Sequence, residues 1–308
     1  MSNDRPYIGI LLMLGFCVMA PIGDAMAKVI GDAVPIGQLV VIRFAVQLAI
    51  LAPIVYVARS PIPLDPRILA LMAARAVLHI LGIGAMFLSL RYLPLADAVA
   101  IAFVMPFIML LLGRTFLNEE VGWRRLAACA VGFCGTLLVV QPSFANVGAP
   151  ALLPLLVALV FSLFMLVTRA LAQTTDAVAM QAISGAIALV ILAPVMVFGA
   201  VTQVTELSMV MPTPREWTLL GALGVLGTLA HLVMTWSLRY APASTVAPVQ
   251  YLEIPVATLV GWVIFRDLPN GMAAVGIIIT IAAGLYILLR ERALSRASAP
   301  ALPGADGQ

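Results

Sequence analysis

The sequence predicts an all-α integral membrane protein whose ten transmembrane helices form two inverted five-helix repeats. Three observations predict this class. The mean hydropathy is +1.11 and only 10% of the 308 residues are charged, whereas about a quarter are charged in globular proteins. Apolar stretches of about 20 residues, the length that crosses a bilayer, follow one another along the chain. Short sequence words also recur in the two halves, 141 to 149 residues apart.

Proline, glycine and charged residues divide the chain into ten apolar stretches with mostly short connections. We expect helices at residues 7–30, 35–57, 68–90, 95–113, 122–141, 150–170, 176–200, 216–238, 243–265 and 271–290. No small-residue cleavage site follows the first stretch, so we expect it to be retained as a helix. Residues 293–308 are rich in Ser, Ala, Pro and Gly, and we expect a disordered cytoplasmic tail there.

The recurring words relate the two halves of the chain. Ser-Leu-Arg-Tyr occurs at 89–92 and again at 237–240, followed each time by one residue and a proline. Lys28 corresponds to Arg169 at an offset of 141, and Pro106 corresponds to Pro255 at an offset of 149. Because each half has an odd number of spans, the second half must enter the membrane from the opposite side. Inverted repeats of this kind are typical of secondary transporters, whose substrate site lies near the midplane between the halves. The predicted units are residues 1–145 and 146–292.

The basic residues predict the orientation. If the N-terminus is cytoplasmic, eleven of the 17 Lys and Arg residues lie on the cytoplasmic side and four on the other side. The excess of positive charge on cytoplasmic loops therefore places both termini in the cytoplasm.

The pattern resembles the ten-helix EamA branch of the drug/metabolite transporter superfamily, over residues 6 to 290. The segments that carry the resemblance are Val34-Pro35 with Arg43-Phe44, the two Ser-Leu-Arg-Tyr-x-Pro words, Pro106 and Asn118-Glu119-Glu120. The second half departs from the last of these, with Phe265-Arg266-Asp267. The chain is similar to bacterial amino-acid exporters of the YddG type. The resemblance implies a multi-pass protein of the bacterial inner membrane that transports neutral or aromatic amino acids.

The ninth span contains the strongest candidate for a substrate-binding residue. Glu253 lies about ten residues into this span, near the bilayer centre, where a charged group costs a few kcal/mol. Pro248 and Pro255 flank it and remove backbone donors, which is tolerated where the helix lines a watery cavity. Gln250 shares a helical face with Glu253, whereas Tyr251 lies on a different face. Glu253 could bind a substrate amine or titrate during transport, or it could be a protonated structural residue.

The fourth span is the symmetric partner of the ninth. Phe103, Met105 and Pro106 lie at the matching depth and could form an apolar wall for an aromatic or thioether side chain, although ordinary helix packing is an alternative. His79 lies near the middle of the third span and is a further candidate for the cavity, ahead of His231 in the eighth. Two histidines without a cysteine or carboxylate at ligand spacing do not predict a metal site.

Charged residues in the first two spans are expected to form a structural cluster. Asp24 and Lys28 stand at i and i+4, the favourable order for a helical pair. Arg43 lies deeper and needs an anion, for which Asp24 is the nearest candidate. A clamp for a substrate carboxylate is the alternative interpretation of Arg43. We expect Arg75, in the third span, to extend towards the membrane surface.

Three functional classes fit a protein of this kind. Inverted repeats, prolines at membrane depth and sparse buried polar groups favour a secondary transporter. An integral membrane enzyme acting on lipid would need a cluster of His, Asp, Glu or Arg at one membrane face. A channel would need a filter-like loop. No Walker motif is present and no basic stretch is interleaved with aromatics, so neither a nucleotide-driven pump nor nucleic-acid binding is predicted. The expected function is export of small amphipathic metabolites, most simply neutral or aromatic amino acids, without a cofactor. Transport of another metabolite or drug is the alternative.

Overall fold

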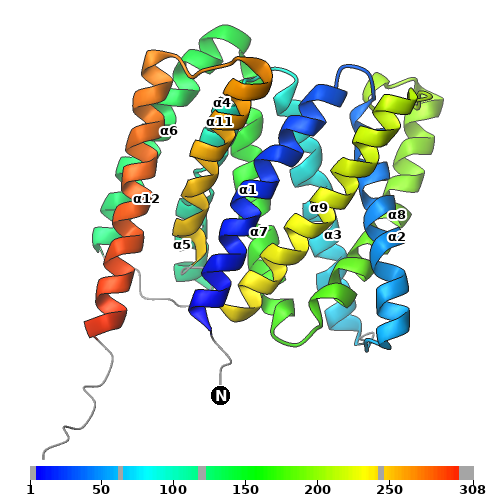
Figure 1. The fold of residues 1–308 in the computed structure, drawn as a ribbon, viewed down its shortest axis with the longest axis horizontal. Helices are drawn as coiled ribbons and strands as arrows, with labels where there is room; N and C mark the ends of the chain where they lie inside the picture. Colours follow the sequence, from blue (N-terminus) through cyan, green and yellow to red (C-terminus); the bar gives the residue numbers. More distant parts are fainter. Residues whose placement is uncertain (1–4, 62–64, 117–122, 242–245, 298–308) are drawn as a thin grey trace, which may run out of the picture.

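The computed structural model describes residues 5–61, 65–116, 123–241 and 246–297, and all of its regular elements are helices. Figure 1 shows them as one layered bundle, with the N-terminus and the end of the last helix at the same face. We call this the terminus face. The first half contains α1 (Pro6–Ile30), α2 (Ile36–Ala58), α3 (Pro66–Leu90), α4 (Leu95–Ala102), α5 (Met105–Phe116) and α6 (Trp123–Val147). The second half contains η1 (Ala149–Leu152), α7 (Leu153–Ala172), α8 (Ala177–Thr202), η2 (Thr205–Leu207), α9 (Pro214–Tyr240), η3 (Ala247–Leu252), α11 (Glu253–Phe265) and α12 (Gly271–Ala297).

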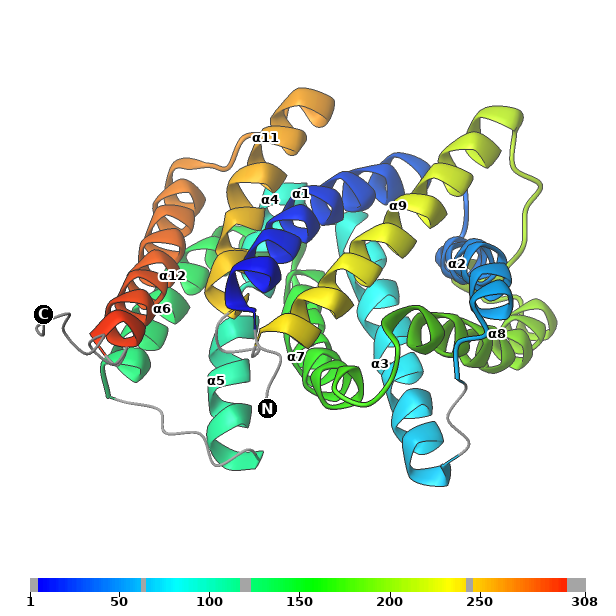
Figure 2. The same ribbon diagram turned by 60° about the horizontal axis from the view of Figure 1, so that its bottom comes forward.

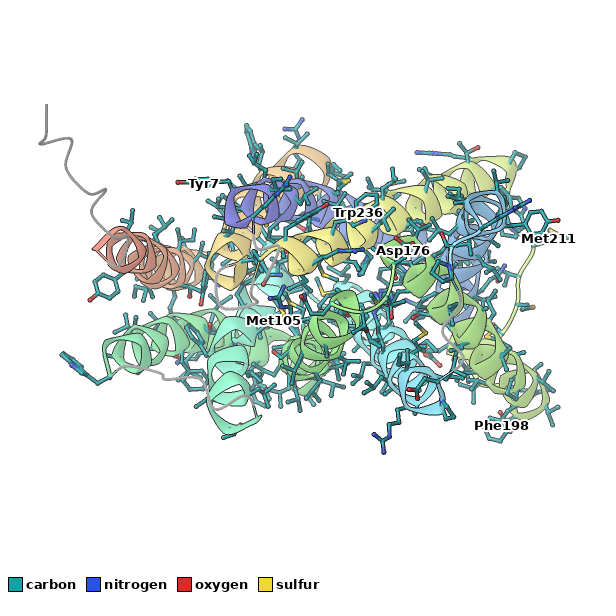
Figure 3. The ribbon with its side chains drawn as sticks, turned by 90° about the horizontal axis from the view of Figure 1, so that it is seen from below. Tyr7, Met105, Asp176, Phe198, Met211 and Trp236 are labelled. Atoms are coloured by element: carbon teal, nitrogen blue, oxygen red, sulfur yellow. The ribbon has the colours of Figure 1, made fainter. Side chains whose placement is uncertain are left out.

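The predicted all-α membrane fold is confirmed. Among the described residues, seven helices are long and apolar enough to cross a membrane, and shorter apolar helices supply the remaining crossings. Large apolar side chains at the rim face outward: Tyr7, Phe198 and Met211 are 81%, 62% and 87% exposed and project away from the bundle in Figure 3. Such a surface would be unfavourable in water but suits contact with lipid.

Local sequence signals start several of the helices. Proline stands at the beginning of α1, α3 and α9, where its missing N–H costs no helical hydrogen bond. Asp65 and Asp176 cap α3 and α8 by accepting bonds from the first backbone amides. Thr213 and Glu216 form a reciprocal capping box at the start of α9. These signals explain why most of the predicted spans agree with the observed helices to within a few residues.

Two helices extend beyond their predicted ends. Helix α6 continues to Val147, past the expected end at residue 141. Helix α12 continues to Ala297, so residues 293–297, which were expected to begin a disordered tail, are helical. Straight-chain and alanine residues at 291–297 are good helix formers, which accounts for the extension. Residues 298–308, the rest of the predicted tail, lie outside the described part of the chain.

Most of the helix packing joins a helix of one half to a helix of the other half. Helix α1 packs on α9, the repeat counterpart of α3, and α3 packs on α7, the repeat counterpart of α1. The pairs α2 with α8 and α6 with α12 each join one element to its own repeat partner, and α4 of the fourth span packs on α11 of the ninth. Figures 1 and 2 show α6 and α12 at one end of the molecule and α2 and α8 at the other, with α1 and α9 crossing between them. This arrangement is that of two inverted repeats.

The fourth and ninth spans are broken at equivalent positions. Helix α4 ends at Ala102 and α5 begins at Met105, with a turn between them. In the ninth span, the 3₁₀ helix η3 gives way to α11 at Glu253. The physical cause is the repeated proline: Pro106 and Pro255 have no N–H, so the carbonyl groups four residues earlier lack their helical donor. The continuous spans expected at 95–113 and 243–265 are therefore interrupted near their middles.

The repeated Ser-Leu-Arg-Tyr words are helix ends that each bind a basic side chain from the same half. Lys28 Nζ on α1 donates to the carbonyl groups of Leu90 and Leu93 at the end of α3. Arg169 Nη1 on α7 donates to the carbonyl groups of Leu238 and Ala241 at the end of α9. Last-turn carbonyls have no helical donor and carry negative partial charge, so a cation there is favourable. We call these two contacts the clasps.

The serine of the repeated word shows where the two halves differ. At the terminus face, Ser237 Oγ donates to the Gly9 carbonyl at 2.6 Å, and Arg5 N–H donates to the Tyr240 carbonyl at 2.9 Å. Both bonds join α1 to α9. The equivalent Ser89 at the opposite face donates to Met86 within its own helix. The serine therefore joins the two halves only at the terminus face. At the opposite face, Gln38 on α2 and the backbone of Val210 in the second half exchange two hydrogen bonds instead.

Candidate functional site

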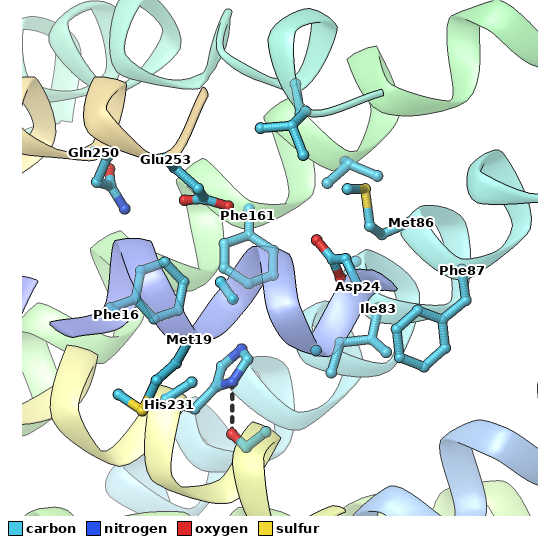
Figure 4. A pocket seen from close by; sticks show the side chains of 18 of the residues that line it. Phe16, Met19, Asp24, Ile83, Met86, Phe87, Phe161, His231, Gln250 and Glu253 are labelled. Atoms are coloured by element: carbon cyan, nitrogen blue, oxygen red, sulfur yellow. Dashed lines mark hydrogen bonds between the residues drawn. The ribbon is translucent and has the colours of Figure 1, made fainter. Parts of the chain in front are cut away.

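A cavity lies between the two halves, in the part of the bundle nearer the face opposite the termini. Its walls come from α1, α2, α3, α4, α5, α7, α9, η3 and α11. It offers about 100 Å³ to the centre of a water-sized sphere, several times the roughly 10–15 Å³ that one buried water needs. Seven aromatic or thioether side chains line the wall, namely Phe16, Met19, Met86, Phe87, Phe103, Met105 and Phe161. Figure 4 labels five of them: Phe16, Met19, Met86, Phe87 and Phe161.

Both broken spans reach this cavity at their breaks. Phe103 and Met105 flank the break of the fourth span, and Gln250 and Glu253 flank that of the ninth; all four line the cavity. At the start of α5, Ser162 Oγ on α7 donates to the Met105 carbonyl at 3.2 Å, which joins the fourth span to the second half beside the break. Discontinuous helices at the interface of inverted repeats are a recurring way to build a substrate site.

Two other predicted site residues, Tyr251 and His79, do not line the cavity. The Tyr251 ring is buried behind the wall and packs on Phe103 and Phe107, with ring centroids 5.4 and 6.3 Å away. His79 is also behind the wall, 4.4 Å from the His231 ring and 4.5 Å from the Phe164 ring. Pro106 lies in α5, and its side chain is outside the described ones. The acidic segment 118–120 likewise lies outside the described residues.

His231, rather than His79, reaches the cavity, together with Arg43 (Figure 4 labels His231). Arg43 Nη2 lies 2.8 Å from His231 Nδ1 and donates to the Gly227 carbonyl at 3.3 Å. Gly227 makes this approach possible, because a Cβ there would lie only 2.8 Å from Arg43 Nε. The signal in the sequence was the i, i+4 spacing of Gly227 and His231 on α9, which the prediction did not connect with Arg43.

The charge cluster expected from Asp24, Lys28 and Arg43 does not form as a unit. No ion pair within 4.0 Å joins these three residues in the part of the chain that the structure describes. Lys28 is held by its clasp on the end of α3 and lies 5.5 Å from the Phe265 ring, so it turns away from Asp24. The helix-end carbonyls satisfy its charge instead of the carboxylate one turn away.

Arg75 also differs from expectation, because it is fully buried and does not extend to the membrane surface. Its Nε donates to Thr168 Oγ1 and its Nη2 to Gln181 Oε1, both at 2.9 Å, and its guanidinium lies 4.6 Å from the centre of the Phe164 ring. Gln47 completes the network by donating to the Gln181 carbonyl at 2.8 Å. This network joins α2, α3, α7 and α8 beside the cavity.

Two carboxylates face the cavity without such partners. Asp24 on α1 and Glu253 at the start of α11 both line it. Neither carboxylate has a hydrogen-bond donor or an ion-pair partner among the described residues. Figure 4 shows both side chains directed into the space between the ribbons that carry them. The site thus combines a broad apolar wall with two acids, Asp24 and Glu253, and the Arg43–His231 pair.

Comparison with known proteins agrees with this architecture. A riboflavin transporter of Rhizobium johnstonii is 32% identical over 219 residues, covering 70% of this chain and 69% of that protein. An S-adenosylmethionine uptake transporter of Rickettsia bellii is 25% identical over 286 residues, covering 92% and 94%. A pseudopaline exporter of Pseudomonas aeruginosa is 25% identical over 290 residues, covering 94% and 95%.

A solved crystal structure has the same fold, with a TM-score of 0.63 at 18% identity over 94% of this chain and 97% of that one. The EamA-like transporter family matches residues 7–141 and 149–290, which are the two halves described above. The chain therefore belongs to the EamA-like transporter family and is a multi-pass membrane transporter of small molecules, not an enzyme.

Proposed function

We propose that the protein is an alternating-access carrier for a small amphipathic metabolite with an aromatic or otherwise bulky apolar part. The observation that carries this proposal is the composition of the cavity wall: seven aromatic or thioether side chains line the cavity together with four ionisable ones, Asp24, Arg43, His231 and Glu253. A wall of this kind favours a ligand with a flat or flexible apolar part and a polar head. The relatives named for riboflavin and for S-adenosylmethionine support the same class.

Neutral and aromatic amino acids are the narrower class that we propose from the sequence, with export as the direction. Flavin-like or nucleoside-like metabolites are the alternative that the named relatives favour. The excess of basic residues on the terminus face supports a cytoplasmic location for both termini. With that orientation, in a bacterial inner membrane, the cavity lies nearer the outer side and the α1–α9 hydrogen bonds close the cytoplasmic side.

Counterflow in proteoliposomes tests the substrate class. Vesicles loaded with one unlabelled compound are mixed with a trace of the same compound carrying a label, for phenylalanine, methionine, threonine, riboflavin and S-adenosylmethionine in turn. We expect phenylalanine and methionine to accumulate faster than threonine, because the cavity wall is mainly apolar. Accumulation of riboflavin or S-adenosylmethionine without any amino acid would make the narrower proposal wrong and support the alternative. Accumulation of none of the five would contradict both.

Glu253→Gln is expected to slow counterflow of amine-bearing substrates by about 10- to 100-fold. The reason is that hydrogen bonds to a charged group contribute about 1.5–3 kcal/mol, and each 1.4 kcal/mol is tenfold in affinity. The matched control is Glu206→Gln, which removes an exposed carboxylate in η2, away from the cavity. If Glu253→Gln transports as well as the wild type, with the same dependence on pH, Glu253 has a structural role only.

A further inference from the structure

The guanidinium of Arg43 is an unusual group in this part of the molecule. It is 2% exposed, lies well inside the membrane-spanning part of α2, and lines the cavity between the two halves. Among the described residues, no carboxylate lies within 4.0 Å of it. A buried charge is normally paired, because removing an unpaired one from water costs several kcal/mol. The equally buried Arg75 resembles Arg43 in having two hydrogen-bond partners, a nearby ring and an Nη1 without a partner among the described residues, but Arg75 does not line the cavity.

The contacts of Arg43 show which polar atoms in its surroundings still lack a hydrogen-bond partner. His231 Nδ1 lies 2.8 Å from Arg43 Nη2, which can only donate, and 2.9 Å from the Gly227 carbonyl, which can only accept, so the two contacts require opposite tautomers of a neutral ring. In the tautomer that accepts from Arg43, the ring proton is on Nε2. Both Arg43 Nη1 and His231 Nε2 are buried and have no hydrogen-bond partner in the described part of the chain.

In that tautomer, two donors from different helices lie side by side without an acceptor among the described residues. In Figure 4 the His231 nitrogen that does not make the dashed bond to α9 points towards the interior of the pocket. Buried polar groups in proteins are nearly always hydrogen-bonded, so a pair like this indicates a partner that comes from outside the chain. One donor is positively charged and the two are adjacent, which suits a group with two acceptor oxygens.

The acids of the cavity do not occupy this position. Asp24 and Glu253 line the same cavity but neither is paired with Arg43. The cavity therefore has a basic pole, Arg43 with His231, and an acidic pole, Asp24 with Glu253. A ligand that carries a carboxylate and an amine can satisfy both poles at once, whereas a neutral ligand leaves both unsatisfied.

We propose that Arg43 and His231 form a subsite for a carboxylate, so that the transported metabolite carries a carboxylate group as well as an apolar part. This rests on the proposed function, since the subsite belongs to the same cavity. Within the cavity, the carboxylate binds Arg43 Nη1 and His231 Nε2, and the apolar part lies against the aromatic wall. The acidic pole receives the amine when the ligand has one.

The test compares two ligands of nearly the same shape. Binding of 3-phenylpropionate and of its uncharged amide, 3-phenylpropionamide, is measured by ligand-induced thermal stabilisation of the purified full chain. We expect the acid to bind the wild type about 10-fold or more tightly than the amide, as loss of a charge-assisted hydrogen bond predicts. In Arg43→Gln this preference should disappear, while binding of the amide stays within about twofold. Arg215→Gln, which removes an exposed arginine at the start of α9, is the matched control and should keep the preference.

Two further variants keep the test decisive if Arg43→Gln does not fold. Arg43→Lys retains the charge and should keep part of the preference for the acid, and His231→Phe retains the ring and should reduce it. Equal binding of acid and amide to the wild type, or binding of neither, would overturn the subsite. If Arg43→Gln weakened binding of the acid and of the amide equally, the subsite would be overturned too, since lost packing would affect both ligands alike. The proposed function fails separately, by absence of counterflow with all five substrates.

Discussion

Gly227→Val should abolish transport while the protein still folds. The added Cβ would lie 2.8 Å from Arg43 Nε and 3.3 Å from its Cζ, closer than real side chains approach. The guanidinium is the end of a long side chain and can move, but it must then leave His231 and the Gly227 carbonyl. Losing two such bonds, each contributing about 1.5–3 kcal/mol, reduces the rate of counterflow by at least about 100-fold.

Gly221→Val is the matched control for this experiment. Gly221 lies on the same helix, and a Cβ added there meets no other atom within 4 Å. Gly221→Val therefore introduces the same β-branched residue, with the same effect on helix propensity, without contacting Arg43. Gly227→Ala should fall between the wild type and Gly227→Val. Counterflow is measured for all four proteins at equal amounts of monodisperse protein. Equal activity of Gly227→Val and Gly221→Val would show that the position of Arg43 is unimportant for transport.

Gly276→Val is expected to cause the largest loss of stability among single substitutions in the α6–α12 pair. A Cβ at this position would overlap the Gly135 carbonyl oxygen and lie 2.9 Å from Val139 Cγ2 and 3.0 Å from Leu138 Cβ. Backbone cannot move aside as a side chain can, so α12 must separate from α6. Small residues allow this kind of close helix contact in a membrane, and overpacking it costs about 3 kcal/mol.

Thermal unfolding in detergent measures this effect. Gly271→Val, at the first residue of the same helix, adds the same side chain where nothing lies within 4 Å and should leave the unfolding temperature nearly unchanged. A Gly276→Val protein that unfolds at the temperature of the Gly271→Val control would contradict the close contact between α6 and α12.

The sequence predicted the elements well because their signals are local. Apolar length, N-terminal prolines and acidic caps act within one helix, so the ten spans and the inverted arrangement could be expected. The repeated proline pointed to the middles of the fourth and ninth spans, and Phe103, Met105, Gln250 and Glu253 do line the cavity. The roles of these residues in transport stay predictions.

The partners of charged side chains could not be predicted in the same way. Lys28 has a carboxylate one turn away on its own helix, yet it binds carbonyl groups 62 and 65 residues further along the chain. Arg43 meets His231 across 188 residues. Such contacts depend on how helices cross and which side chains face each other, and periodicity within one helix contains no information about that. His231 was ranked below His79 for the same reason.

The clasps bear on the order in which the protein is assembled. Lys28 needs only Leu90 and Leu93, so the first clasp can close once the third helix has entered the bilayer, before any of the second half has been synthesised. Arg169 likewise needs only residues up to Ala241. Each half can therefore fix its own first and third helices as it leaves the ribosome, in keeping with units that fold in order from the N-terminus. The pairing of α6 with α12 must wait for the last helix, which makes it the final step of insertion.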